Sequence, residues 1–173
     1  AARALAAERP YQAWLDEPHA AAATAGWRNS MKRPSSTRVF VERLGRIAHL
    51  VGDANNPFHA DNSDPRLEGS RDDYERYLER RMTVFPTVFY GLELELQLDR
   101  YLDSMFARSA HLYPLVAEEY FRGGARRSSA EFDDRSTAFG VASVSYSRAV
   151  SDLVNIYYYI WKEAGGDVRS AAV

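Results

Sequence analysis

The chain has 173 residues, a net charge of −2, a hydrophobic fraction of 46% and no cysteine. This length and composition fit one folded domain and argue against an intrinsically disordered chain. The near-neutral charge gives no sign of a basic surface for gripping a nucleic acid, and the lack of cysteine excludes disulfides and thiolate metal ligands.

Hydrophobic periodicity and the positions of proline and glycine predict helices along the whole chain. The expected helices cover residues 1–8, 11–28, 37–54 (capped by Ser36 or Thr37), 71–82, from after Pro86 to 108, 111–122 and 135–164. The expected loops are 30–36, 55–70 and 125–134. Strand-like alternation is scarce, and no apolar run approaches the roughly 20 residues that cross a bilayer. The sequence therefore predicts an all-α fold, a compact multi-helix bundle of about six helices in a single domain over residues 1–173.

Two imidazoles and two carboxylates lie in the middle of the chain. His49 and Asp53 are four residues apart on one expected helix, so their side chains share a face. Pro57 stiffens the exit from that helix and turns the chain back, which is expected to bring His59 toward the same face. Glu75 follows on the next expected helix. This donor set suits zinc, with manganese or iron as alternatives.

The same residues allow a structural interpretation. A histidine and an aspartate four residues apart on a helix often form a plain ion pair, and an aspartate on an apolar helix is costly unless it is paired or metal-bound. A helical domain that contains a buried pair of His49 and Asp53 and no metal is therefore an alternative.

Taken as a unit, residues 49–59 (HLVGDANNPFH) resemble the signature of the zinc-dependent phospholipase C family, whose fold the fungal single-strand-specific nucleases share. The family pattern, H-x-x-G-D-x-x-x-P-x-H, matches here at every fixed position. Residues 73–77 resemble a later helix that carries another zinc-binding carboxylate, and residues 157–161 resemble the aromatic-rich closing helix of these proteins.

The resemblance implies a bundle of the zinc phospholipase C type that holds up to three zinc ions. His49 and Asp53 would belong to a two-metal cluster bridged by Asp53, the catalytic residue, and His59 and Glu75 would hold a third zinc. The implied reaction is hydrolysis of a phosphodiester by activated water. The implied enzyme is phospholipase C-like and acts on a phospholipid headgroup, with single-stranded nucleic acid as the alternative substrate. The family's usual secretion implies a secreted or periplasmic protein.

The later carboxylate is the first place where the chain departs from the family pattern. The family has a histidine four residues before it, and this chain has Arg71, which stays protonated and offers no lone pair to a metal. Arg71 is expected to bind a phosphate oxygen of the substrate. Asp61, Asp64 or Asp72 are the alternatives for the missing ligand.

The amino-terminal ligands of the family are the second departure. The family uses an N-terminal tryptophan with further histidine and aspartate ligands, and the only upstream pair of suitable type here, Asp16 and His19, has a different spacing. The chain is therefore expected to lack the family's N-terminal segment. The alternative is a catalytically weak or inactive relative that serves as a binding or structural module.

Overall fold

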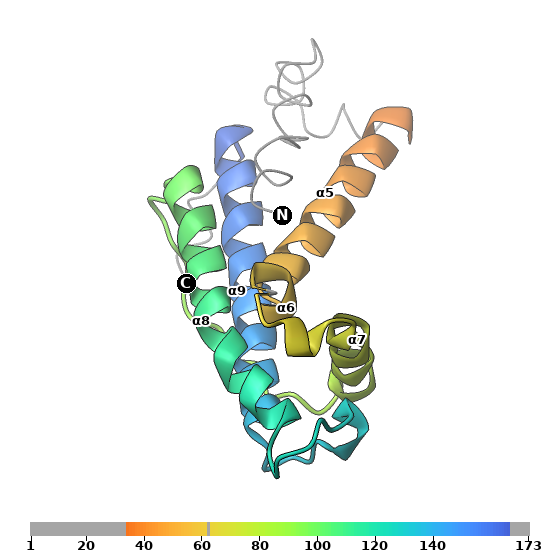
Figure 1. The fold of residues 1–173 in the computed structure, drawn as a ribbon. Helices are drawn as coiled ribbons and strands as arrows, with labels where there is room; N and C mark the ends of the chain where they lie inside the picture. Colours follow the sequence, from red (N-terminus) through yellow and green to blue (C-terminus); the bar gives the residue numbers. More distant parts are fainter. Residues whose placement is uncertain (1–33, 62, 167–173) are drawn as a thin grey trace.

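The computed structural model describes residues 34–61 and 63–166, and over them the chain is all-helical (Figure 1). The α-helices of this part are α5 (Pro34–Ala54), α6 (Pro57–Ala60), α7 (Ser70–Arg81), α8 (Leu98–Tyr120) and α9 (Thr137–Glu163). Two short 3-10 helices, η1 (Pro65–Leu67) and η2 (Ser129–Glu131), lie in the connections. The predicted all-α class is confirmed for these residues. The predicted helices 1–8 and 11–28 lie outside them.

The helices are arranged around the pair formed by α8 and α9, which lie side by side (Figure 1). The helix α5 crosses against α9, and α6 continues the chain from the end of α5 and packs against α8. The helix α7 contacts α6 and η2. The end of α5, α6 and α7 thus meet at one corner of the bundle, and this corner carries the residues that resemble a metal-binding signature.

Two apolar clusters hold these helices together. The first is mainly aromatic and joins α6, α7, α8 and the start of α9, and its buried rings are Phe58, Tyr74, Tyr77, Phe85, Tyr113, Tyr120 and Phe132. The rings of Tyr120 and Phe132 meet edge to face with centroids 4.9 Å apart, which is a favoured arrangement of aromatic rings. The second cluster is mainly aliphatic and joins α5, α8 and α9 through Ile47, Val51, Leu102, Met105, Ile156 and Ile160.

Three predicted helices correspond to observed ones: 37–54 to α5, 71–82 to α7 and 135–164 to α9. Because α5 already begins at Pro34, the predicted cap at Ser36 or Thr37 is wrong. The end of α5 at Ala54 agrees with the prediction, so His49 and Asp53 both lie in its last turns.

The segment 55–70, predicted as a loop, contains α6 and η1. Each begins with a side-chain cap followed by proline, because the Asn56 Oδ1 atom accepts from the Phe58 amide at 3.0 Å and the Asp64 Oδ1 atom accepts from the Arg66 amide at 3.0 Å. Both helices are too short to show a helical period in the sequence. Their effect is to fix the path of the chain directly after Asp53.

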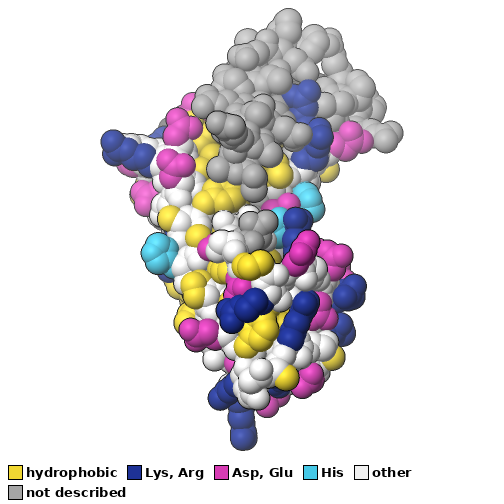
Figure 2. Space-filling model, in the orientation of Figure 1, with side chains coloured by type: hydrophobic (Ala, Val, Ile, Leu, Met, Phe, Trp, Pro, Cys, Tyr) yellow, Lys and Arg dark blue, Asp and Glu magenta, His cyan; other side chains and the backbone are white. Residues whose placement is uncertain are grey.

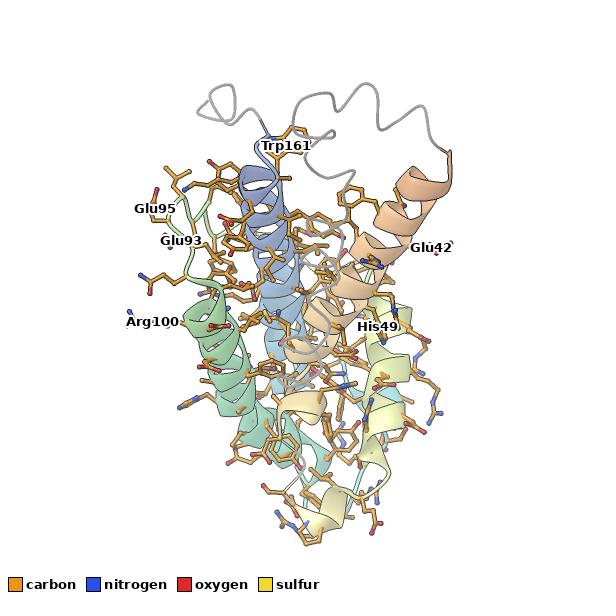
Figure 3. All side chains as sticks on the ribbon, turned by 90° about the horizontal axis from the view of Figure 1, so that it is seen from above. Glu42, His49, Glu93, Glu95, Arg100 and Trp161 are labelled. Carbon is orange, nitrogen blue, oxygen red and sulfur yellow. The ribbon has the colours of Figure 1, made fainter. Side chains whose placement is uncertain are left out.

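The segment 86–97 differs most from its prediction. It was expected to be helical, but α8 begins only at Leu98 and residues 86–97 run without helix along the bundle. We call residues 86–97 the strap. Figure 3 shows Glu93 and Glu95 on the outer side of the strap, with α9 between them and α5.

Side chains of α9 hold the strap in place. Three residues of α9 spaced four apart share one helix face and accept hydrogen bonds from main-chain N–H groups of the strap. The pairs are the Val88 amide with Ser147 Oγ at 3.1 Å, the Tyr90 amide with Ser151 Oγ at 3.0 Å and the Glu93 amide with Asn155 Oδ1 at 2.7 Å. These bonds satisfy amide groups that would otherwise favour a helix.

The helix α8 is one unbroken element, whereas the sequence predicted a break before a new helix at 111–122. Pro114 lies inside α8, where it removes a helical hydrogen bond at a cost of roughly 3 kcal/mol. Pro114 is exposed, while its neighbours Tyr113 and Val116 are buried against the bundle. The packing of the buried face offsets the cost of the proline.

Candidate functional site

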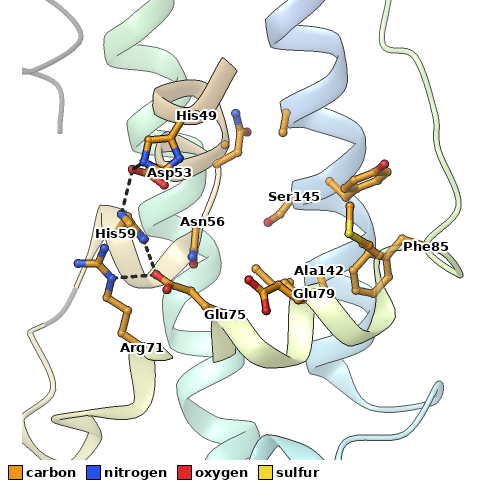
Figure 4. A pocket seen from close by; sticks show the side chains of 16 residues that line it. His49, Asp53, Asn56, His59, Arg71, Glu75, Glu79, Phe85, Ala142 and Ser145 are labelled. Carbon is orange, nitrogen blue, oxygen red and sulfur yellow. Dashed lines mark hydrogen bonds and ion pairs between the residues drawn. The ribbon is translucent and has the colours of Figure 1, made fainter. Parts of the chain in front are cut away.

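A pocket of about 400 Å³ lies between the end of α5, α6, α7 and α9 (Figure 4). Its wall includes the four metal ligands that the sequence predicts, His49, Asp53, His59 and Glu75, together with the predicted phosphate contact Arg71. The structure therefore brings together residues spread over three helices. Their roles stay predictions.

Asp53 lies between two imidazoles. Its Oδ2 atom is 3.5 Å from His49 Nε2 and 3.7 Å from His59 Nδ1. Neighbouring ligands on a tetrahedral zinc ion with bonds of about 2.0–2.1 Å stand about 3.3–3.5 Å apart. The carboxylate thus faces each imidazole at nearly the spacing of two ligands on one ion. The His49 side chain is 77% exposed and that of His59 only 10%, so one imidazole is at the rim and the other inside.

Glu75 receives two donors at one oxygen. Its Oε1 atom is 2.7 Å from His59 Nε2 and accepts a hydrogen bond from Arg71 Nε at 3.0 Å. Burial raises the pKa of Glu75, but the hydrogen bonds and charges of Arg71 and His59 outweigh it and lower the pKa below its usual value. Glu75 is therefore a carboxylate, and the imidazole of His59 lies between two acidic side chains.

These donors fit a metal in pairs. Imidazole and carboxylate are suitable zinc ligands, and the pairs of His49 with Asp53 and His59 with Glu75 are already adjacent. Within residues 34–61 and 63–166, however, no three histidine, aspartate or glutamate side chains form a group that holds one ion. Asp16 and His19, the upstream candidates, lie outside the described residues.

The acidic residues named as substitutes for the missing ligand lie elsewhere. Asp64 pairs with Arg66 through both carboxylate oxygens, and Asp61 accepts the amide of Ser63 at 2.9 Å. Asp64 and Asp72 line a separate pocket. None of the three lines the pocket that contains His59 and Glu75.

The opposite wall of the pocket was missed by the sequence prediction. It consists of residues of α7, the turn after it and α9: Leu78, Glu79, Met82, Phe85, Ala142, Ser145, Tyr146 and Ala149. On α9 these residues follow a helical spacing of three and four, and the small side chains among them leave the space that becomes the pocket. A run of small residues in a helix is also typical of close helix packing, so the sequence carries no distinct signal for this wall.

No family model matches the chain, and neither a curated protein nor a solved structure matches it. The resemblance to the zinc phospholipase C family therefore stays a prediction from the sequence pattern. Among the described helices, none is long and apolar enough to cross a membrane.

Arg71→His is expected to add about one zinc ion per chain. An imidazole at position 71 shares a helix face with Glu75, and His59 already contacts Glu75 at 2.7 Å, so the variant completes a set of two histidines and one glutamate. Zinc per chain is measured by elemental mass spectrometry after dialysis against zinc. Arg76→His, at an exposed position of the same helix, is the matched control. Equal zinc in the two variants would contradict the expectation.

Proposed function

We propose that the chain is a metal-dependent phosphodiester hydrolase of the zinc phospholipase C type. The observation that carries this proposal is the meeting of His49, Asp53, His59 and Glu75 in one pocket, with Asp53 Oδ2 3.5 and 3.7 Å from two imidazoles. A structural ion pair needs one imidazole and one carboxylate, and here a second imidazole faces the same oxygen. A secreted or periplasmic location is part of the same proposal.

Each side chain has a distinct task in the proposed site. His49 and Asp53 would hold a metal, and Asp53 supplies the negative charge between the imidazoles. His59 and Glu75, whose Nε2 and Oε1 atoms are 2.7 Å apart, would hold a further zinc, and Nδ1 of His59 is 3.7 Å from Asp53 Oδ2. When bound, zinc lowers the pKa of water and neutralises phosphate oxygens. No protein nucleophile is required.

Arg71 is the proposed phosphate contact. It lines the pocket and gives its Nε hydrogen to Glu75, which holds the guanidinium in place. Its terminal amino groups can then donate hydrogen bonds to phosphate oxygens, because a guanidinium binds phosphate through a planar fork of N–H groups. The pair of Arg71 and Glu75 thus orders a positive charge next to the site of hydrolysis.

A phospholipid headgroup suits this surface better than a nucleic acid. Nonspecific binding to a nucleic acid depends on several lysine or arginine contacts to phosphates. On the face shown in Figure 2, acidic side chains lie among the basic ones, and the net charge of the chain is −2. Single-stranded nucleic acid is the alternative substrate.

A second function has its own supporting observation. Arg71 lies beside Glu75 where a third donor to the pair of His59 and Glu75 is needed, and the described residues offer no group of three donors. This arrangement supports the second function, in which the chain is a catalytically weak or inactive relative that acts as a binding or structural module.

The deciding experiment is zinc content together with hydrolysis of bis-p-nitrophenyl phosphate, measured on the chain without a histidine tag. The proposal expects bound zinc, hydrolysis that stops with a chelator, and recovery when zinc is returned. Zinc without hydrolysis favours the binding module. If the chain shows no bound zinc and no hydrolysis, the result favours a helical domain that binds no metal.

A further inference from the structure

The pocket has two chemically different sides. Its polar side carries the candidate metal ligands and Arg71. Its other side, from α7, the turn after it and α9, is mainly apolar and is formed by Leu78, Met82, Phe85, Ala142 and Tyr146, with the exposed carboxylate Glu79 beside them. In the close view of Figure 4, Ser145 lies between these sides, with the histidines on one hand and Phe85 on the other.

Ser145 carries a buried hydroxyl without a partner. Its side chain lines the pocket, the residue is only 7% exposed, and its Oγ atom has no hydrogen-bond partner among the described residues. Other buried serines of α9 are bonded: Ser143 donates to the carbonyl of Phe139 at 2.8 Å, and Ser147 donates to the carbonyl of Pro86 at 3.0 Å. An unsatisfied buried hydroxyl is costly, and a partner supplied by a ligand removes that cost.

We propose that Ser145 is a ligand-binding residue, whose hydroxyl bonds the phosphate end of an amphiphilic ligand while Leu78, Met82 and Phe85 contact its apolar group. The choice of a phosphate as the polar group of this ligand rests on the proposed function. The rest is carried by the unpartnered hydroxyl and by the apolar wall beside it. A hydroxyl both donates and accepts, so it suits either a charged or an ester oxygen of a phosphate group.

The apolar wall leads from the interior to the surface. Phe85 is buried, Leu78 is partly buried and Met82 is 48% exposed at the rim. Methionine is flexible and adapts to irregular apolar shapes. A substituent that begins at Ser145 therefore gains apolar contact along this wall before it meets solvent.

Binding of two phosphonates to the zinc-loaded chain tests this role by isothermal titration calorimetry. Hexylphosphonate and methylphosphonate differ only in apolar length, and their carbon–phosphorus bond keeps hydrolysis out of the measurement. The dissociation constant of hexylphosphonate is expected to be at least about tenfold lower than that of methylphosphonate, because several methylene groups leave water. Leu78→Ala is expected to reduce this ratio, because it removes part of the apolar wall.

Ser145→Ala is expected to weaken both phosphonates by about tenfold, the usual effect of losing one hydrogen bond to a charged group. Ser143→Ala is the matched control, because that hydroxyl is already bonded within α9 and does not line the pocket. The melting temperature of free Ser145→Ala is expected to stay equal or rise, since no hydrogen bond is lost. A lower melting temperature with unchanged phosphonate binding indicates a structural serine and overturns the proposal.

The outcomes separate this role from the proposed hydrolysis. Phosphonate binding that depends on Ser145 in a chain without phosphodiesterase activity supports the role and rejects hydrolysis. Hydrolysis by the unmodified chain, with equal affinity for both phosphonates and no effect of Ser145→Ala, rejects the role alone. Failure of both phosphonates to bind also overturns it.

Discussion

Asp53→Asn is expected to lower zinc-dependent hydrolysis of bis-p-nitrophenyl phosphate by roughly a thousandfold, because several kcal/mol of transition-state stabilisation depend on a metal that the carboxylate holds. The Asp53 Oδ2 atom is 3.5 Å from His49 Nε2 and 3.7 Å from His59 Nδ1, so this oxygen is shared between two imidazoles. Asparagine keeps the shape of the side chain but loses the negative charge. Zinc content is expected to fall together with the rate.

The fold is expected to survive this substitution. The described contacts of the Asp53 side chain are those to the two imidazoles, so no main-chain group loses a partner. Circular dichroism and the melting temperature check this expectation. Asp103→Asn, at an exposed position of α8, is the control for a lost surface charge. Full activity in Asp53→Asn would show that hydrolysis does not occur at this site.

The helices that were predicted from the sequence are those whose signals are local. In α5 and α7 the buried residues recur at helical spacing, and α9 is long enough for the same pattern to be clear. The carboxyl-terminal limit of α5 was also predictable, because Pro57 follows closely. Local signals were therefore sufficient for the class of fold and for the helices that carry Asp53 and Glu75.

The strap was not predictable because its partners are distant in sequence. The amides of Val88, Tyr90 and Glu93 bind side chains of α9 that lie 59 to 62 residues further along the chain. A local window contains helix-forming residues and no sign of these partners. The continuous α8 has a similar cause, because packing of its buried face offsets the cost of Pro114.

The candidate site also has a part that local sequence predicts and a part that depends on packing between distant segments. His49 and Asp53 share a helix face by spacing alone, and Pro57 directs the chain so that His59 returns to them. Ser145 reaches the pocket only because α9 packs against α5. The polar side of the pocket is thus encoded by one short stretch and the next helix, and the apolar side depends largely on tertiary packing.

Asp152 connects the helix that carries Asp53 with the rest of the bundle, because it ties the end of α5 to α8 and α9. It is 2% exposed and accepts two hydrogen bonds from Arg108, both at 3.0 Å. It also accepts from the Tyr101 hydroxyl at 2.7 Å and from Asn55 Nδ2 at 3.0 Å. Asn55 follows directly after the last residue of α5, two positions after Asp53.

Asp152→Ala is expected to lower the free energy of unfolding by about 3 kcal/mol, measured by urea unfolding with circular dichroism. Removing one partner of a buried ion pair costs about 3–5 kcal/mol, and the Arg108 side chain is 33% exposed, so water takes up part of its unpaired charge. Asp103→Ala on α8 is the control and is expected to change stability by less than about 0.5 kcal/mol. A loss below about 1 kcal/mol in Asp152→Ala would contradict the network. Asn55 also loses its bond to Asp152 and keeps only the bond from its Nδ2 atom to the Val51 carbonyl within α5. The end of α5 is then held less firmly to α9, and zinc affinity at Asp53 is expected to fall along with stability.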